Sequence, residues 1–112
     1  MPPSPAAAPS VALSLVSCPQ AQAEALARAL VEQQLAACVS VLPGMQSVYR
    51  WQGAVEQASE ALLLIKHPAQ DFAALKDAVL RLHPYELPEL LMVSVDAGHR
   101  PYLDWVLSAC AK

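Results

Sequence analysis

Residues 38–66, CVSVLPGMQSVYRWQGAVEQASEALLLIK, contain the strongest structural signal in the chain. Two extended segments, Cys38–Tyr49 and Ala54–Lys66, flank Trp51-Gln52-Gly53, whose glycine supplies the positive φ that a hairpin tip requires. Each arm has roughly 12 residues, whereas typical strands have 5 or 6. Pro43-Gly44 predicts a kink or bulge in the first arm. The hairpin should project beyond so small a body, and its unpaired edges are expected to pair with another chain.

The rest of the sequence predicts two strands and three helices around this hairpin. They are a buried strand over Val11–Ser17, an amphipathic helix over Gln20–Ala37, a helix from Pro68 to His83, a buried strand over Leu90–Val95 and a short helix over Pro101–Ala109. Pro84 ends the second long helix, because it disfavours helical backbone at the preceding residue. This order predicts an α+β fold, the ferredoxin-like βαββαβ sandwich of a four-stranded antiparallel sheet with two helices on one face, followed by a C-terminal helix.

The composition is richly apolar for one small domain. Of the 112 residues, 55% are hydrophobic and 15% are charged, which suggests that some apolar surface is buried against other subunits. The net charge is −3 and the 7 basic residues are scattered, so nucleic acid is not an expected partner. No apolar run approaches the roughly 20 residues that a membrane span needs, so no membrane association is expected.

The cysteine count and the N-terminus bear on the compartment. The cysteines are Cys18, Cys38 and Cys110, an odd count without paired spacing, which favours a reducing compartment and a cytoplasmic location. Residues 1–10 have no basic residue before their apolar part, so they are a poor signal peptide. They are rich in Pro and Ala and are predicted to be a disordered tail, with residues 11–112 as the folded domain.

The stretch Leu82–Leu90 (LHPYELPEL) gathers a histidine, a tyrosine and two glutamates in a mostly apolar chain. In the predicted topology the last strand lies beside the first, so Cys18 and Glu89 lie at one edge of the sheet. The hairpin tip at Trp51 and the helix end at His83 reach the same edge. We therefore expect a site there.

Four segments carry a family resemblance: LAACVSVLPGMQSVYRWQG, SEALLLIK, LHPYELPELL and YLDW. Over Val11 to Leu107 the chain resembles the CutA family, the divalent-cation tolerance proteins. The resemblance implies a ferredoxin-like fold, a tightly packed homotrimer with contacts made by the long hairpin, similarity to the trimeric PII signalling proteins, and a link to copper and other divalent cations. Two positions depart from the family pattern: Ala54 stands where a lysine is common, and His67 where a threonine is common.

The resemblance also implies metal ligands at Cys18, His83 and Glu89. Cys18 precedes a helix, whose dipole favours the thiolate that binds metal; the alternative is a small buried residue at a strand end. Thiolate and imidazole together suit Cu(I), Cu(II) or Zn(II). Alternatively, His83 terminates the helix and Glu89 is a solvated carboxylate.

Distance is the main objection to a single chelate. His83 and Glu89 are six residues apart, which is about 20 Å when extended, whereas ligands of one ion sit within about 4 Å. The loop must fold back, another subunit must contribute, or these residues do not share an ion. Glu86 is a closer option.

Aromatic and charged side chains of the hairpin and of the loop form a second candidate site. The aromatic residues can line a ligand cleft between subunits or serve as oligomer contacts, and the charged residues of the return strand can bind a ligand or form an interfacial salt bridge. The residues of this candidate ligand cleft or trimer interface are Tyr49, Trp51, Glu60, Lys66, Tyr85 and Glu86.

The remaining candidates are assigned no chemistry. We expect His67 and His99 to be isolated and exposed, and Trp105 to lie in the core or at an interface. Cys38 and Cys110 are expected to be buried and inert.

The sequence favours a binding protein over an enzyme, since it has no Ser/His/Asp order, no Gly-rich phosphate loop and no HExxH motif. The first hypothesis is a cytoplasmic homotrimer that binds divalent metal, with copper favoured and no obligatory cofactor, and that acts in metal tolerance. The alternatives are a PII-like signalling trimer that binds an effector, and a structural or scaffolding trimer without a metal role.

Overall fold

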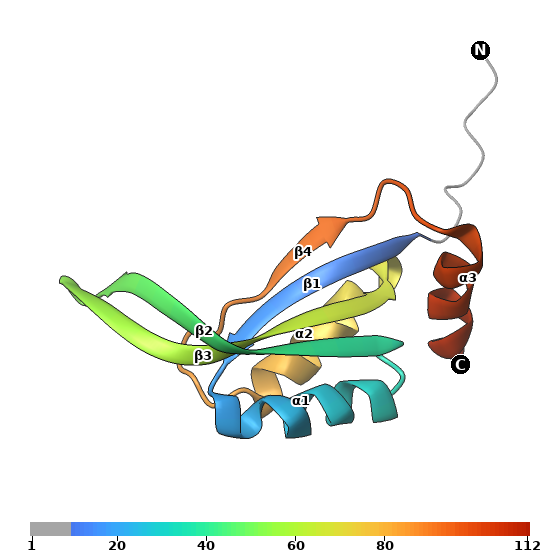
Figure 1. The fold of residues 1–112 in the computed structure, drawn as a ribbon. Helices are drawn as coiled ribbons and strands as arrows, with labels where there is room; N and C mark the ends of the chain where they lie inside the picture. Colours follow the sequence, from blue (N-terminus) through green and yellow to red (C-terminus); the bar gives the residue numbers. More distant parts are fainter. Residues whose placement is uncertain (1–9) are drawn as a thin grey trace, which may run out of the picture.

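The computed structural model describes residues 10–112, so the predicted tail over residues 1–10 lies almost entirely outside the described residues. The elements are β1 (Val11–Cys18), α1 (Gln20–Glu32), β2 (Cys38–Trp51), β3 (Ala54–Pro68), a 3-10 turn (Ala69–Asp71), α2 (Phe72–Leu82), β4 (Leu91–Ser94) and α3 (Arg100–Ala109). The strands form one antiparallel sheet in the order β2-β3-β1-β4. This confirms the predicted ferredoxin-like βαββαβ architecture with a C-terminal helix (Figure 1).

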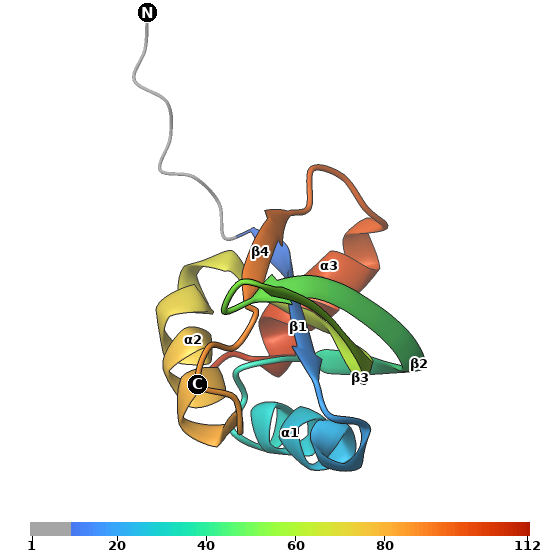
Figure 2. The ribbon, with the colours of Figure 1, turned by 90° about the vertical axis from the view of Figure 1, so that its left-hand side faces the viewer.

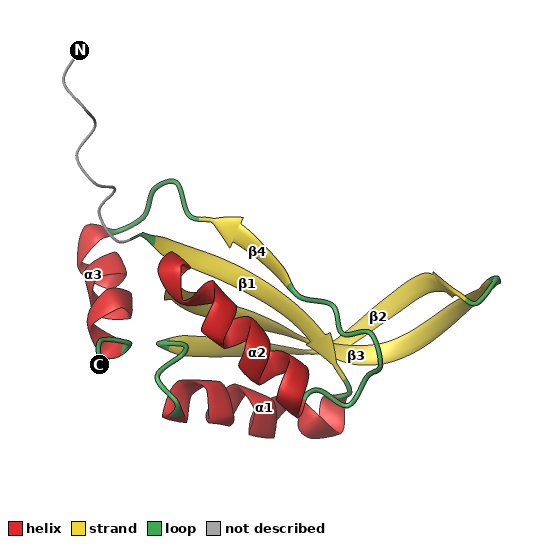
Figure 3. Ribbon diagram, turned by 180° about the vertical axis from the view of Figure 1, so that it is seen from behind, coloured by secondary structure: helices red, strands yellow, loops and turns green. Residues whose placement is uncertain are grey.

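Helices α1 and α2 cover one face of the sheet, and α3 stands at the end of the sheet where β1 begins (Figures 2 and 3). Alternate residues of β3 point toward the two helices and form the core with side chains of β1, α1 and α2. The fully buried members of largest volume include Leu30, Leu63, Ile65 and Leu75. The apolar periodicity of the sequence therefore marks the correct faces of these elements.

Helix α1 is shorter than predicted, because it ends at Glu32 instead of Ala37. Gln34 adopts a left-handed conformation with φ of 58°, which stops the helix. The backbone N–H groups of Leu35 and Ala36 then both donate to the carbonyl oxygen of Leu30. Leu35 continues the helical spacing of apolar residues, but it reaches the core from this C-terminal turn.

The long hairpin is confirmed, and it projects from the body (Figure 1). Its tip is a two-residue turn in which Gln52 and Gly53 have φ of 49° and 83°. The predicted bulge is a register shift between Leu42 and Met45. There Gly44 has φ of 74°, and its backbone N–H donates to Oε1 of Gln20 at 2.6 Å, which ties the bulge to the start of α1.

The sheet face opposite α1 and α2 is apolar. The strand register places Leu15, Leu62, Leu64 and Leu91 side by side on this face. Leu91 is exposed, and on the projecting part of the hairpin Val48 and Val55 are 67% and 66% exposed. These surfaces match the excess of apolar residues that the composition shows.

His67 is fully buried, so the expectation that it is exposed is wrong, whereas His99 is exposed as expected. The Nδ1 atom of His67 lies 2.8 Å from the Pro68 carbonyl oxygen. Because this carbonyl can only accept a hydrogen bond, Nδ1 carries the proton. The Ser14 hydroxyl therefore donates to Nε2 at 2.7 Å. Burial lowers the pKa of the His67 imidazole, although the hydrogen bond to Pro68 and the charge of Asp71 act in the opposite direction.

This burial predicts a loss of stability in mild acid. Below the ordinary pKa of 6.5 the histidine is protonated in the unfolded chain but stays neutral in the fold, so proton uptake favours unfolding. The contribution of neutral His67 to the free energy of unfolding is complete above about pH 6.5, and it is lost as the pH falls toward the lowered pKa. We expect the decrease in the free energy of unfolding between pH 7.5 and pH 5, measured in urea, to be smaller for His67→Gln than for the wild type. His99→Gln should keep the wild-type decrease, and an equal decrease in His67→Gln would contradict the assignment.

Candidate functional site

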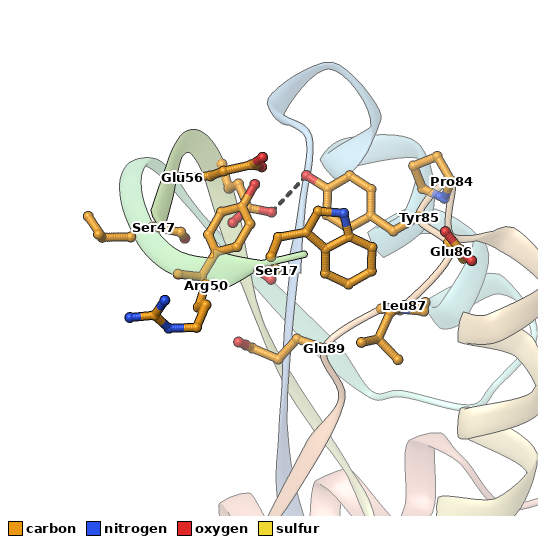
Figure 4. A pocket seen from close by; sticks show the side chains of 14 residues that line it. Ser17, Ser47, Arg50, Glu56, Pro84, Tyr85, Glu86, Leu87 and Glu89 are labelled. Atoms are coloured by element: carbon orange, nitrogen blue, oxygen red, sulfur yellow. Dashed lines mark hydrogen bonds between the residues drawn. The ribbon is translucent and has the colours of Figure 1, made fainter. Parts of the chain in front are cut away.

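A pocket lies between the hairpin and the loop that joins α2 to β4 (Figure 4). Its volume is about 860 Å³. One wall is made of residues 47–51 of β2 with Glu56 and Glu60 of β3, the other is the loop over residues 84–89, and Ser17 completes it from the end of β1. We call this the hairpin pocket.

His83 ties the loop to the end of β1. Its Nε2 lies 2.7 Å from the Ser17 carbonyl oxygen, and the backbone N–H of Tyr85 donates to its Nδ1 at 3.1 Å. Because the carbonyl can only accept and the amide can only donate, the proton of the imidazole lies on Nε2. Both nitrogens of His83 are therefore occupied within the chain, and the residue is only 7% exposed.

Tyr85 links the loop to the hairpin. Its ring packs on His83 at a centroid distance of 4.7 Å, and its hydroxyl donates to Oε2 of Glu60 at 2.7 Å. Burial raises the pKa of Tyr85 to about 12, and the hydrogen bond to Glu60 and its negative charge act in the same direction. The phenol consequently keeps its proton at neutral pH and serves as a donor to the Glu60 carboxylate.

Cys18 is a fully buried thiol at the end of β1, where it packs in the main core. Burial raises the pKa of this thiol, and the charge of Glu60 raises it further. Of the two alternatives for Cys18, the structure matches the small buried residue at a strand end, and desolvation opposes the thiolate that the helix dipole favours.

The three predicted metal ligands lie in different surroundings. Cys18 is in the core, His83 has both nitrogens occupied, and Glu89 lines the hairpin pocket as an exposed carboxylate. Among residues 10–112, no three side chains of Cys, His, Asp or Glu group closely enough to hold a metal ion. The assignment of these ligands stays a prediction that requires a rearrangement or a second chain.

Of the predicted cleft residues, Tyr49, Trp51, Glu60, Tyr85 and Glu86 line the hairpin pocket, but Lys66 does not. Lys66 Nζ donates to Ser40 Oγ and lies 3.8 Å from Cys38 Sγ, farther along β3 from the tip. The interfacial salt bridge suggested for these charged residues requires a second chain and stays a prediction. The one ion pair among residues 10–112 joins Arg28 to Glu24.

Cys38 is half-buried, so the expectation that it is buried is wrong, whereas Cys110 is buried as expected. Trp105 is 47% exposed and lies beside Tyr102 with the ring centroids 5.6 Å apart. Of the two alternatives for Trp105, the core of this chain is therefore wrong, and the interface stays a prediction.

The pocket is also lined by side chains that the sequence pattern does not single out, namely Ser17, Ser47, Arg50 and Glu56. A two-residue turn at Gln52-Gly53 fixes the hairpin register and places Glu56 opposite Tyr49. That rule identifies Glu56 from the sequence once Tyr49 is chosen. Ser17 enters only through the tertiary packing of the loop.

The family profile described as "CutA1 divalent ion tolerance protein" matches residues 12–109. This chain belongs to the CutA1 family. It is 49% identical to the divalent-cation tolerance protein CutA of Thermus thermophilus over 84 residues, which cover 75% of this chain and 82% of that protein. The family assignment confirms the resemblance found in the sequence.

Two further relatives show the extent of the similarity. The human protein CutA is 44% identical over 87% of this chain, but the matched region is only 55% of the human protein. The structure of the "PII-like protein CutA" of Nostoc sp. PCC 7120, in apo form, superposes with a TM-score of 0.85 at 37% identity and covers 89% of this chain and 97% of that one. Within residues 10–112, no helix is both long and apolar enough to span a membrane.

The contact between Tyr85 and Glu60 predicts the effect of removing one hydroxyl. Tyr85→Phe leaves the buried Glu60 carboxylate without its donor and should lower the free energy of unfolding by roughly 1 to 3 kcal/mol. Tyr49→Phe is the matched control, because no hydrogen bond of the Tyr49 hydroxyl is found among residues 10–112, and it should have little effect. Urea denaturation at pH 7 measures both, and equal losses in the two variants would contradict this role of Tyr85.

Proposed function

We propose that this chain is a homotrimeric binding protein that acts in divalent-cation tolerance, and that it takes up its ligand at the hairpin pocket. Membership of the CutA1 family supports the tolerance role. The observation that carries the proposal is the pocket itself, which places four glutamates and one arginine between the hairpin and the loop. Carboxylate oxygens are ligands for divalent cations.

Direct metal binding takes a specific form in this chain. Glu89 and Glu86 already face the pocket, whereas His83 becomes a ligand only if Nδ1 is released from the Tyr85 amide or Nε2 from the Ser17 carbonyl. Cys18 joins them only if its buried thiol is exposed and deprotonated. Copper, which we favour for this ligand set, thus requires a local opening at the end of β1.

A PII-like effector-binding role is the second candidate. A volume of about 860 Å³ lies in the range of roughly 300 to 1,000 Å³ that small-molecule sites occupy. The relative from Nostoc, itself described as PII-like, has the same fold. The effector would enter the hairpin pocket and alter the position of the loop.

The trimer in this proposal is supported by two uncovered apolar surfaces. One is the sheet face around Leu15, Leu64 and Leu91, and the other is the projecting hairpin with Val48 and Val55. Three such chains would bury these surfaces against one another. A purely structural trimer makes the same contacts, so it differs only in leaving the pocket empty.

The proposed role is binding and not catalysis. Ser14 and His67 are hydrogen-bonded in a manner that resembles a nucleophile and its base, but both are fully buried.

The free cysteines Cys18, Cys38 and Cys110 suit a reducing compartment, and we place the protein in the cytoplasm.

Native mass spectrometry with added Cu(II) and Zn(II) tests the metal role and the assembly together. We expect a trimer that takes up whole ions per chain. The uptake should be lost in His83→Ala, Cys18→Ser and Glu89→Gln, because each removes one of the proposed ligands. Glu32→Gln, an exposed change on α1, is the control and should bind as the wild type does.

The two parts of this proposal fail separately. A monomer mass would contradict the trimer. A trimer that stays free of metal, or that binds equally well in all variants, would contradict metal uptake at these residues.

A further inference from the structure

The hairpin pocket carries an excess of negative charge. Glu56, Glu60, Glu86 and Glu89 line it, and Arg50 is the one basic side chain among the lining residues. None of these glutamates is paired with a cation within residues 10–112, where the ion pair found joins Arg28 to Glu24 on α1. A concave site of this kind raises the local concentration of cations.

Glu60 is the most buried of these four glutamates. It is only 5% exposed, and Tyr85 donates to its Oε2. Within residues 10–112 no side-chain oxygen is buried without a partner, so the second oxygen of Glu60, for which no donor is found, keeps some exposure. A cation that enters the pocket would meet this oxygen and form a charge-assisted contact with it.

The same pocket has aromatic walls. Tyr49 and Trp51 line it from β2, and Tyr85 lines it from the loop. The faces of such rings attract cations that have shed part of their water. Tyr85 is also fixed at both ends, since His83 holds its backbone and Glu60 its hydroxyl.

Size separates an organic cation from an inorganic one. A volume of about 860 Å³ is far larger than a single ion requires. Among residues 10–112, no group of three ligating side chains is arranged for a metal ion. An inorganic ion would also leave the aromatic walls without contacts.

We propose that the hairpin pocket binds an organic cation, an ammonium group on an apolar or aromatic body, with the ammonium at Glu60 and the body against Tyr49, Trp51 and Tyr85. This deepens the effector-binding form of the proposed function by naming the class of ligand. It rests on the hairpin pocket as the binding site and on that pocket remaining open in the proposed trimer, and it does not require metal uptake.

Three probes with one aromatic body and different charge test the proposal: phenethylammonium, 2-phenylethanol and phenylacetate. Isothermal titration calorimetry of the full chain at pH 7 and low salt should show the ammonium binding at least about tenfold more tightly than the alcohol, because it alone gains the carboxylate and cation–π contacts. Phenylacetate should not bind. High salt should lower the affinity for phenethylammonium and leave the affinity for 2-phenylethanol unchanged.

Matched variants locate the site. Glu60→Gln keeps the shape of the side chain. It should lower the affinity for phenethylammonium about tenfold and leave the affinity for 2-phenylethanol unchanged. Glu56→Gln, on the exposed wall, should weaken the ammonium less, and it keeps the test decisive if Glu60→Gln does not fold. Glu32→Gln, on the surface of α1, should bind as the wild type does. Equal binding of the alcohol and the ammonium, or wild-type ammonium affinity in both pocket variants, would overturn the proposal.

Titration with zinc chloride separates this inference from the metal role. If zinc binds and phenethylammonium does not, the inference fails and metal uptake stands. If the ammonium binds with the expected dependence on Glu60 and no metal is taken up, the inference stands and direct metal binding fails. If neither binds, another part of the assembly fills the pocket, and both fail.

Discussion

The register shift between Leu42 and Met45 is the constraint on which the site depends. Gly44 supplies a backbone conformation that other residues adopt only at a cost, and the hydrogen bond from its N–H to Gln20 fixes the bulge against α1. Beyond the bulge the two strands leave the sheet together and project past the body (Figure 1). The same shift therefore produces both the wall of the hairpin pocket and the exposed arm that another chain can cover.

A short chain of contacts ties the other wall in place. The Ser17 carbonyl accepts from His83, His83 accepts from the Tyr85 amide, and the Tyr85 hydroxyl donates to Glu60. Glu60 lies opposite Met45 in the strand register, at the edge of the bulge. The loop is therefore attached to the hairpin at the point where the hairpin leaves the sheet.

The fold followed from the sequence because each of its signals is local. Apolar periodicity, the Gln52-Gly53 turn and the Pro43-Gly44 bulge each act within a few residues, and topology then leaves few arrangements. Apart from the C-terminal end of α1, the expectations that failed concern burial at specific side chains. His67 follows a lysine at the end of a strand and looked exposed, yet its partner Ser14 lies 53 residues away. For Cys18 the local sequence allows both a thiolate before a helix and a small buried residue, and only the packing of the thiol in the core decides between them. Such outcomes depend on tertiary contacts that no local pattern contains.

The distribution of groups around the pocket bears on how this chain acts. The imidazole and the thiol, which are the softer ligands, are used for structure, and the carboxylates and aromatic rings are the groups that face the pocket. Metal uptake through Cys18 and His83 would therefore break the contacts that hold the loop, whereas uptake of an organic cation at Glu60 would preserve them. The first event couples ligand binding to a local opening of the fold and the second does not. The two modes of binding therefore differ in whether the contacts of His83 with Ser17 and Tyr85 survive.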